Sequence, residues 1–209
     1  MSIVIAIDGT AASGKGTLAK KLAAHFGFAH LDTGSLYRAV GVKWKAEGGN
    51  PAGIAAGLTP FDLSRPDLRS REAGEWASKV AAMDDVRAAL LDFQRNFAKN
   101  PPENAPGAVL DGRDIGTVIC PDAPAKLFVT ASLPVRAARR AAELEAQGKA
   151  VSLEEITEDL KKRDERDQNR SAAPLSQAKD ADLLDTSNLD IEAAFAAALA
   201  LVNAALARG

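Results

Sequence analysis

The sequence predicts an α/β fold built on a parallel β-sheet, because short apolar runs alternate with longer segments of helical periodicity. Ile3–Ile7 is a β-branched run that stops at Asp8, as expected of a strand buried on both faces. A helical segment carrying Leu18, Leu22 and Phe26 follows it directly. Strands that alternate with helices favour a parallel sheet with right-handed crossovers.

The later segments continue this alternation. Further strands are predicted at residues 30–32, 108–110, 126–129 and 183–184. Further helices are predicted at residues 36–47, 86–99, 136–147 and 191–206, from apolar side chains at helical spacing. Ser152 and Glu155 fit a capping box that begins another helix. The stretch from Pro51 to Pro66 is rich in Gly and Pro, which predicts loop.

Length and composition limit the classes of protein that the chain can belong to. The 209 residues suit one α/β domain, and 46% of them are apolar, enough for a substantial core. A net charge of -2 provides no overall basic field for a nucleic acid polymer. The one cysteine, Cys120, cannot form an intrachain disulfide. We interpret it as a small buried residue of a protein in a reducing compartment.

The sequence also predicts where the protein acts. The apolar run at residues 3–7 is too short for a signal peptide, and no stretch is expected to span a bilayer. We therefore expect a cytoplasmic protein without a membrane or nucleic acid partner.

The strongest motif is the segment GTAASGKGT, which follows a predicted buried strand and begins a predicted helix. Gly9 and Gly14 permit backbone conformations closed to other residues, so successive N–H groups can point at phosphate oxygens. The helix N-terminus adds partial positive charge, and Lys15 can reach the β- and γ-phosphates. The segment is therefore predicted to be a P-loop that binds ATP, through Gly9, Thr10, Ala11, Ala12, Ser13, Gly14, Lys15, Gly16 and Thr17.

One position departs from the usual form of this motif. Ser or Thr commonly follows the lysine, whereas Gly16 follows it here and Thr17 comes next. Thr17 is therefore expected to contact a phosphate. The Gly-Lys-Gly-Thr form resembles nucleoside monophosphate kinases more than GTPases or motor ATPases. The sequence has neither the Asn-Lys-x-Asp guanine motif nor the protein kinase motifs.

A second set of charged residues points to an acceptor for the phosphoryl group. Arg38 lies near the start of a predicted helix, and Arg113 and Asp114 directly follow the strand at 108–110. Ligands of parallel α/β sheets bind beyond the carboxyl ends of the strands. Arg113 and Asp114 are therefore expected where the chemistry takes place.

The helix that begins near residue 152 has a face that changes along its length. Its first half carries an apolar stripe, formed by Leu153, Ile156 and Leu160. The same spacing then gives a charged stripe, formed by Arg163, Asp167 and Arg170. Such a face suits a helix that packs at one end and enters a polar cleft at the other. The alternative is a solvated Arg163–Asp167 pair at i, i+4.

The predicted helix at residues 136–147 carries several cations, which can be interpreted in two ways. Arg136, Arg139, Arg140 and Lys149 lie on it or in the glycine-containing loop that follows. They could belong to a lid that closes over the transferring phosphates, or form a solvated charged face.

Together these segments resemble bacterial cytidylate kinases, a family within the nucleoside monophosphate kinases. The resemblance covers nearly the whole chain and is carried by residues 7–17, 31–38, 77–82, 86–90, 111–118 and 163–170. It implies a P-loop three-layer fold, with a five-stranded parallel sheet flanked by helices and with acceptor-binding and lid segments. It implies a single kinase domain, 1–209, with a core of about 1–48, 104–135 and 180–209. The acceptor-binding segment would be about 49–103, and the lid with its returning helix about 136–172.

The resemblance also implies roles for individual residues. The acceptor phosphate would be held by Arg38, Arg113 and Arg170, with Arg69 as a further candidate. Cytosine would be recognised by Ser78, Arg87 and Asp114, and the sugar by Thr33, Arg163 and Asp167. The catalytic residues would be Lys15, Arg113, Arg163 and Arg170. Asp111 would hold water bound to the Mg²⁺ that accompanies ATP.

The predicted base contacts make chemical sense. Cytosine has acceptors at O2 and N3 and a donor at its amino group, so an arginine can donate while Asp114 accepts. Uracil has O4 in place of the amine, which would leave Asp114 facing another acceptor. Such an unpaired buried group costs about 1–3 kcal/mol.

Two positions depart from the family pattern. Thr33 stands where many relatives have Ser, which keeps the hydroxyl. The stretch 58–78 is shorter than the strand-bearing insert of many bacterial members and is expected to contain only loop and helix.

The expected reaction is transfer of the γ-phosphoryl of ATP to CMP or dCMP, giving ADP and CDP or dCDP, in pyrimidine nucleotide metabolism. The alternatives are another P-loop kinase, acting on UMP, AMP or a non-nucleotide acceptor, and a regulator that binds ATP without transferring it. A monomer is the family expectation.

Overall fold

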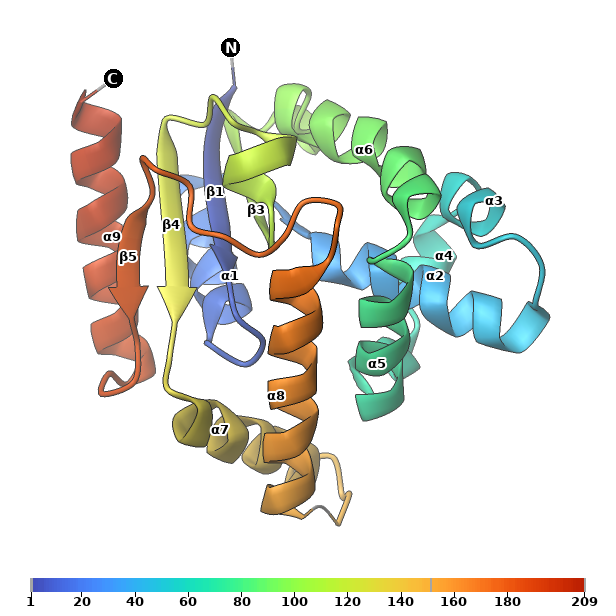
Figure 1. The fold of residues 1–209 in the computed structure, drawn as a ribbon. Helices are drawn as coiled ribbons and strands as arrows, with labels where there is room; N and C mark the ends of the chain where they lie inside the picture. Colours follow the sequence, from blue (N-terminus) through green and yellow to red (C-terminus); the bar gives the residue numbers. More distant parts are fainter. Residues whose placement is uncertain (1, 151, 209) are drawn as a thin grey trace.

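A five-stranded, wholly parallel sheet in the order β2-β3-β1-β4-β5 forms the centre of the computed structural model, which describes residues 2–150 and 152–208 (Figure 1). The strands are β1 (Ile3–Gly9), β2 (Ala29–Asp32), β3 (Gly107–Gly112), β4 (Ala125–Thr130) and β5 (Asp182–Asp185). Every strand predicted from the sequence is present, and the predicted fold class is confirmed.

Helices surround the sheet and extend from it toward the carboxyl ends of the strands (Figure 1). The long ones are α1 (Lys15–Phe26), α2 (Thr33–Glu47), α5 (Arg71–Val80), α6 (Asp84–Lys99), α7 (Leu133–Glu145), α8 (Leu153–Asn169) and α9 (Ile191–Arg208). The short ones are α3 (Pro51–Ala56), α4 (Pro60–Leu63), η1 (Pro66–Arg69), η2 (Pro102–Asn104) and the π-helical turn η3 (Ile115–Ile119).

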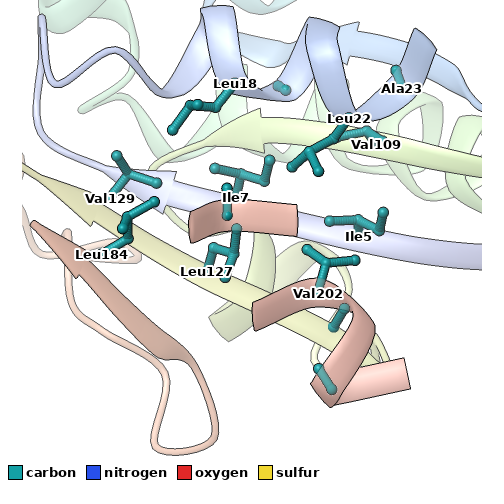
Figure 2. Packing of buried hydrophobic residues seen from close by; sticks show 14 of the residues in the cluster. Ile5, Ile7, Leu18, Leu22, Ala23, Val109, Leu127, Val129, Leu184 and Val202 are labelled. Atoms are coloured by element: carbon teal, nitrogen blue, oxygen red, sulfur yellow. The ribbon is translucent and has the colours of Figure 1, made fainter. Parts of the chain in front are cut away.

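The alternation of side chains along β1 divides the core into two layers. Ile5 and Ile7 pack against α1 and α9, together with Leu22 and Val202 (Figure 2). Ala6 faces the opposite layer, formed with α6 and η3. Burying each Ile or Leu fully contributes about 1.5–3 kcal/mol, so these layers fix the sheet that positions the loops.

Three short helices replace the loop expected between Pro51 and Pro66. Pro51, Pro60 and Pro66 each stand in the first turn of a short helix, α3, α4 or η1. Proline is tolerated there because its missing N–H would have no helical partner. The prediction of loop was therefore wrong, although the expectation of loop and helix without strand over residues 58–78 is confirmed.

Two details of α8 differ from the expectation. Leu153 is 53% exposed, whereas Ile156 and Leu160 pack against α7, so the apolar stripe begins one turn late. Ser152 accepts a hydrogen bond of 3.4 Å from the N–H of Glu155, the first half of a capping box. The Glu155 carboxylate instead binds Arg71 of α5, at 2.9 Å.

Helix α9 is long and apolar enough to cross a membrane, judged by length and composition alone. The expectation that no stretch meets this test was therefore wrong for residues 191–208. A core helix of a soluble protein passes the same test. Here Ala194, Ala198 and Val202 are buried in the layer that covers β1 and β4.

Candidate active site

The carboxyl ends of β1, β2 and β3 bring the predicted site residues to one edge of the sheet. Asp32, the last residue of β2, pairs in register with Asp111 of β3. Asp8 near the end of β1 pairs with Gly112. The loop after β1, the start of α2 and the residues after β3 therefore meet at this edge, where parallel sheets bind ligands.

The P-loop depends on glycine at two positions. A Cβ on Gly9 would lie 1.9 Å from the carbonyl oxygen of Val129, so no other residue fits beside β4. Gly14 has a left-handed backbone with φ 88° and caps the N-terminus of α1. These two positions set the path of the loop between strand and helix.

The carbonyl groups of the P-loop accept hydrogen bonds from side chains, one within the loop and others from later segments. Ser13 donates to the carbonyl of Thr10 at 3.0 Å, and Thr186 donates to the carbonyl of Ser13 at 2.9 Å. Arg136 donates to the carbonyl of Ala11 at 3.3 Å. Over residues 2–150 and 152–208, the main-chain N–H groups of residues 10–16 have no protein acceptor. Those N–H groups are available to an anion.

Two of the four cations considered for the lid hold the P-loop in place. Arg136 is buried and also pairs with Asp164 of α8 at 2.7 Å. Arg139 donates to the carbonyls of Ser13 at 3.5 Å and Thr186 at 2.7 Å. The interpretation as a solvated face was therefore wrong for Arg136, which is 5% exposed, and the lid interpretation of both residues stays a prediction.

The other two cations of that run remain near solvent. Arg140 pairs with Glu143 at 2.7 Å and lines the cavity described below. Lys149 is exposed.

Lys15 lies in an environment that disfavours its charge. Burial, together with the nearby Arg113 guanidinium, lowers the pKa of Lys15 to about 7. Asp111 and Asp32 act in the opposite direction. Since a bound polyphosphate would supply negative charge, Lys15 is suited to an anionic ligand.

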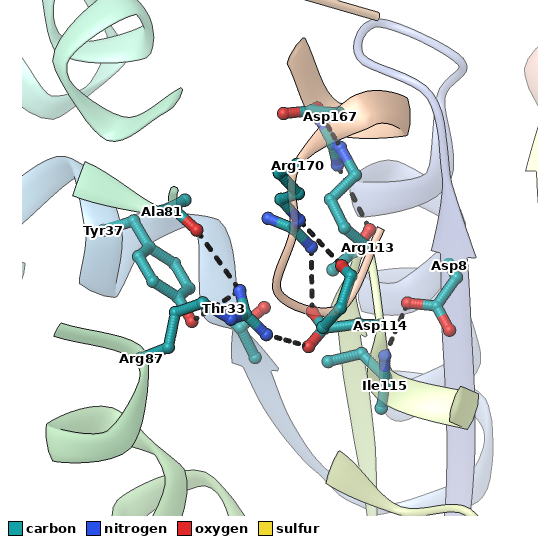
Figure 3. A network of polar contacts seen from close by, with 12 residues as sticks. Asp8, Thr33, Tyr37, Ala81, Arg87, Arg113, Asp114, Ile115, Asp167 and Arg170 are labelled. Carbon is teal, nitrogen blue, oxygen red and sulfur yellow. Dashed lines mark hydrogen bonds and ion pairs between the residues drawn. The ribbon is translucent and has the colours of Figure 1, made fainter. Parts of the chain in front are cut away.

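Asp8 connects the P-loop strand to the turn after β3. Its carboxylate accepts hydrogen bonds from the N–H groups of Ile115 at 2.7 Å and Gly116 at 2.8 Å (Figure 3). Burial raises the pKa of Asp8 to about 6 even though these bonds favour the charged form. Asp8 thereby fixes the segment that carries Arg113 and Asp114.

Arg113 joins this segment to α8. Its Nε donates to Asp167 at 2.8 Å (Figure 3). Arg163 lies 3.9 Å from the same carboxylate oxygen. Although burial alone would raise the pKa of Asp167, Arg113 and Arg163 hold it below its usual value. Burial lowers the pKa of Arg163 to about 9, and Arg113 adds to that effect. The predicted charged stripe of α8 therefore enters a cleft and is not a solvated surface pair.

The carboxylate of Asp114 contacts two arginines that come from different helices. Its Oδ2 binds Arg87 of α6, and its Oδ1 lies 3.6 Å from Arg170 at the end of α8 (Figure 3). Arg87 also donates to the Tyr37 hydroxyl at 3.5 Å. Burial lowers the pKa of Arg170, and the like charge of Arg87 lowers it further. The four side chains form a buried polar cluster that spans α2, α6 and the ends of β3 and α8.

The start of α2 adds further groups to the same edge. Arg38 donates to Asp32 at 3.1 Å. The Thr33 hydroxyl donates to the carbonyl of Asp111 at 2.8 Å. His30 Nε2 lies 2.8 Å from Asp111 Oδ1. His30 thus holds one carboxylate oxygen of Asp111. The other oxygen has no hydrogen bond to the described residues and lies toward the P-loop.

One cavity of about 500 Å³ collects most of the predicted site residues. From the P-loop it is lined by Ala11, Ala12, Ser13, Gly14, Lys15, Gly16 and Thr17. From the acceptor set it is lined by Thr33, Arg38, Arg69, Ser78, Asp111, Arg113, Asp114, Arg163, Asp167 and Arg170. Three predicted residues, Gly9, Thr10 and Arg87, are not in its wall. Arg69 is exposed at its margin.

The wall of this cavity is basic, in contrast to the chain as a whole. Eight Lys or Arg residues and five Asp or Glu residues line it among the described residues, an excess of three positive charges, whereas the chain carries -2. A second cavity of about 800 Å³ lies between α5, α7 and α8 and shares five lining residues with it: Gly74, Arg140, Leu160, Arg163 and Arg170. Local concentration of positive charge suits an anionic ligand.

Several buried polar atoms of the site have no hydrogen-bond partner within residues 2–150 and 152–208. They include the Ser78 and Thr10 hydroxyls, Arg163 Nε and Arg170 Nη2. Buried polar groups are normally paired. The hydroxyl of Ser78 and the two guanidinium nitrogens are therefore available to a ligand.

Three of the lining residues to which sequence reasoning gave no role are Asp32, Tyr37 and His30. Tyr37 and Asp32 stand within the segment 31–38 but received no role, and His30 directly precedes it. The pairing of Asp32 with Arg38 could have been suggested by their spacing of six residues around a helix start. The contact between His30 and Asp111 could not, because 81 residues separate them.

Comparison with known proteins identifies the family. The family model described as cytidylate kinase matches residues 5–59 and 57–204. The cytidylate kinase of Xanthobacter autotrophicus is 60% identical over 208 residues, which cover 97% of this chain and 98% of the relative. That of Cereibacter sphaeroides is 57% identical over 209 residues, covering 100% and 99%.

Solved structures agree on the fold. An uncharacterized protein from Eubacterium ventriosum has a TM-score of 0.57 at 19% identity, covering 97% of this chain and 99% of that one. TT1252 from Thermus thermophilus has a TM-score of 0.52 at 21% identity, covering 98% of each. At such identities the likeness shows the fold alone. The family model and the full-length relatives go further, and the chain belongs to the cytidylate kinase family.

Proposed function

We propose that this protein transfers the γ-phosphoryl group of ATP to CMP or dCMP, giving ADP and CDP or dCDP. Family membership confirms the expected class, an ATP-dependent nucleoside monophosphate kinase, and supports cytidylate as the acceptor. The observation that supports the individual roles is that Arg38, Arg113 and Arg170 line the same cavity as Lys15.

The donor side of the proposal rests on the P-loop. Its unpaired N–H groups and Lys15 would bind the phosphates of ATP, with the carbonyls turned outward by Ser13, Thr186 and Arg136. Because the groups are already oriented, little reorganisation is needed when charge moves between phosphates. We assign Lys15 to the bridging region between the β- and γ-phosphates.

The residues at the end of β3 fit a magnesium ion bound together with ATP. Asp111 and Asp32 offer carboxylate oxygens close to Lys15, and Mg²⁺ prefers one or two carboxylates with water and phosphate completing its shell. Over residues 2–150 and 152–208, His, Cys, Asp and Glu side chains form no group of three or more that could hold a metal ion by themselves. When bound, Mg²⁺ would neutralise phosphate charge.

The acceptor phosphate would be held by Arg38, Arg113 and Arg170. Its oxygen is already ionised at neutral pH, so the attack needs no general base and the residues act by position and charge. Arg113 and Arg170 would hold the nucleophile in line with the γ-phosphoryl group. Arg163, whose buried Nε has no hydrogen-bond partner among the described residues, would add positive charge as the phosphoryl group passes.

The base would be recognised by the cluster around Asp114. We propose that Asp114 and Ser78 accept from the cytosine amino group while Arg87 donates to its acceptors. In the ligand-free cluster Asp114 is bound to Arg87 and Arg170, so cytosine would share these groups. Thr33, Arg163 and Asp167 would hold the sugar, with Arg69 at the margin.

An acceptor comparison tests the proposal. The protein, ATP and MgCl₂ are mixed separately with CMP, dCMP, UMP, AMP or GMP, and formation of ADP is followed. We expect the highest kcat/KM with CMP or dCMP. Equal rates with AMP or GMP would contradict the assignment of the base, and a rate without acceptor equal to that with CMP would contradict kinase activity. The cytoplasmic location, the monomeric state and the division into core, acceptor-binding segment and lid remain predictions. Residue 151 of that lid lies outside the described residues.

A further inference from the structure

His30 is a polar residue of the site for which the proposed reaction has no role. Its Nε2 lies 2.8 Å from Oδ1 of Asp111, and the side chains are 18% and 4% exposed. The pair is therefore largely shielded from solvent. Asp111 is also the residue proposed to hold magnesium-bound water, which makes its orientation important.

The register of the sheet explains how the two side chains meet. His30 of β2 pairs with Val109 of β3, and Asp111 is two residues further along the same strand. Residues two apart on a strand share one face, and a diagonal neighbour on the next strand is within reach of a long side chain. Val109 packs in the layer covered by α1. His30 and Asp111 therefore lie on the face toward the first turn of α1.

The two carboxylate oxygens of Asp111 have different surroundings. Oδ1 contacts His30, whereas Oδ2 lies 3.7 Å from the place where a Cβ on Gly16 would be. The main chain of Asp111 is fixed separately, because its carbonyl accepts from Thr33 at 2.8 Å. His30 is thus the contact that sets the rotation of this carboxylate and directs Oδ2 at the P-loop.

We propose that His30 is a positioning residue that orients Asp111 toward the magnesium ion bound with ATP. The inference rests on the proposed function of Asp111. Hydrogen-bonded partners of a carboxylate that serves a metal fix its geometry, and their loss weakens metal binding on the order of tenfold or more. His30 donates from Nε2, acts through Asp111 and contacts neither reacting phosphate.

Binding measurements without an acceptor test this role apart from catalysis. The affinity for adenylyl imidodiphosphate is measured by calorimetry with and without MgCl₂. The His30→Leu variant removes the donor, and His30→Gln keeps an N–H at similar reach. His25→Leu is the matched control, since the chain has only two histidines and His25 is exposed on α1.

MgCl₂ raises the affinity of the unaltered protein for the nucleotide by some factor, and we expect this factor to be on the order of tenfold smaller in His30→Leu. The affinity measured without MgCl₂ should be unchanged. His30→Gln and His25→Leu should behave like the unaltered protein. Full magnesium dependence in His30→Leu would overturn the proposal, and so would an equal loss with and without MgCl₂. Formation of ADP with CMP by the unaltered protein tests the proposed function separately.

Nuclear magnetic resonance gives a second measurement that requires no nucleotide. With two histidines, long-range ¹H–¹⁵N spectra of the imidazole rings contain two sets of signals, and His25→Leu assigns them. The proposal expects a proton on Nε2 of His30. A ring with a bare Nε2 and a protonated Nδ1 would contradict it.

Discussion

Arg113 at the end of β3 donates a hydrogen bond of 2.8 Å to Asp167 of α8, and this bond ties the core of the sheet to the returning helix. Both side chains are largely buried, at 14% and 6% exposed. Breaking one partner of a buried pair leaves the other charge uncompensated. The arginines around this bond are therefore the places where substitutions should have their largest effects.

Arg170→Ala should reduce kcat/KM for CMP by an amount equivalent to about 2–5 kcal/mol, because it removes a desolvated charge at the proposed acceptor phosphate. Steady-state kinetics with saturating ATP measure this loss. Lys161→Ala, an exposed change on the same helix, is the control and should leave kcat/KM unaltered. Unaltered kcat/KM in Arg170→Ala would remove Arg170 from the acceptor site.

Asp114→Asn should shift the base preference from CMP toward UMP. An amide can donate a hydrogen bond to uracil O4, which the carboxylate cannot. Leaving the buried carboxylate unpaired against O4 costs about 1–3 kcal/mol of binding free energy. We expect the ratio of kcat/KM for CMP to that for UMP to fall tenfold or more. The ratio is insensitive to a general loss of active protein. If it stays constant, Asp114 does not face the exocyclic group.

Binding of ATP should be accompanied by proton uptake near pH 8. The pKa of Lys15 is about 7 in the free protein, so most molecules carry a neutral amine at that pH, and the phosphates of ATP favour the charged form. Calorimetry in buffers of different ionisation enthalpy measures the uptake. Lys15→Arg, which keeps its charge throughout, should show much less. Identical uptake in that variant would assign the proton to another group.

Asp8 should make folding more favourable under acidic conditions. Its pKa is about 6 in the folded protein against 3.8 for the model group, so between these values the folded state binds more protons than the unfolded state. The contribution of Asp8 to the free energy of unfolding therefore falls by about 3 kcal/mol as pH rises through this window.

Urea unfolding of Asp8→Asn between pH 4 and 7 measures that contribution. The difference in free energy of unfolding between the unaltered protein and Asp8→Asn should be largest at pH 4 and should decrease toward pH 7. Asp92→Asn, an exposed change on α6, should show no such trend. A difference that is constant with pH would mean that Asp8 has an ordinary pKa.

The parts of the fold and site that follow local rules could be predicted from the sequence. The apolar runs placed all five strands, and the spacing of Arg163, Asp167 and Arg170 put them on one face of α8 because the helix repeat is fixed. Leu153 was predicted to pack but is exposed, because periodicity does not reveal where the partner helix ends.

Contacts to main-chain carbonyls could not be predicted in the same way. Arg136 and Arg139 are cations in sequence, yet they bind carbonyl groups of residues 11 and 13, which are about 125 positions away. Every residue has a main-chain carbonyl group, so the sequence does not show which carbonyl a given arginine binds. The pairing of Arg87 with Asp114 likewise depends on how α6 crosses the end of β3.

The attachment of Arg136 and Arg139 to the P-loop limits how the kinase can open. The first two turns of α7 are pinned to the donor loop, and the far end of α8 is pinned through Asp167. If α7 and α8 move during the reaction, we expect the hinges to lie beyond Arg139 on one side and before Arg163 on the other. We then expect exchange of nucleotides to move the described residues between these points and to leave the carboxyl ends of the strands in place.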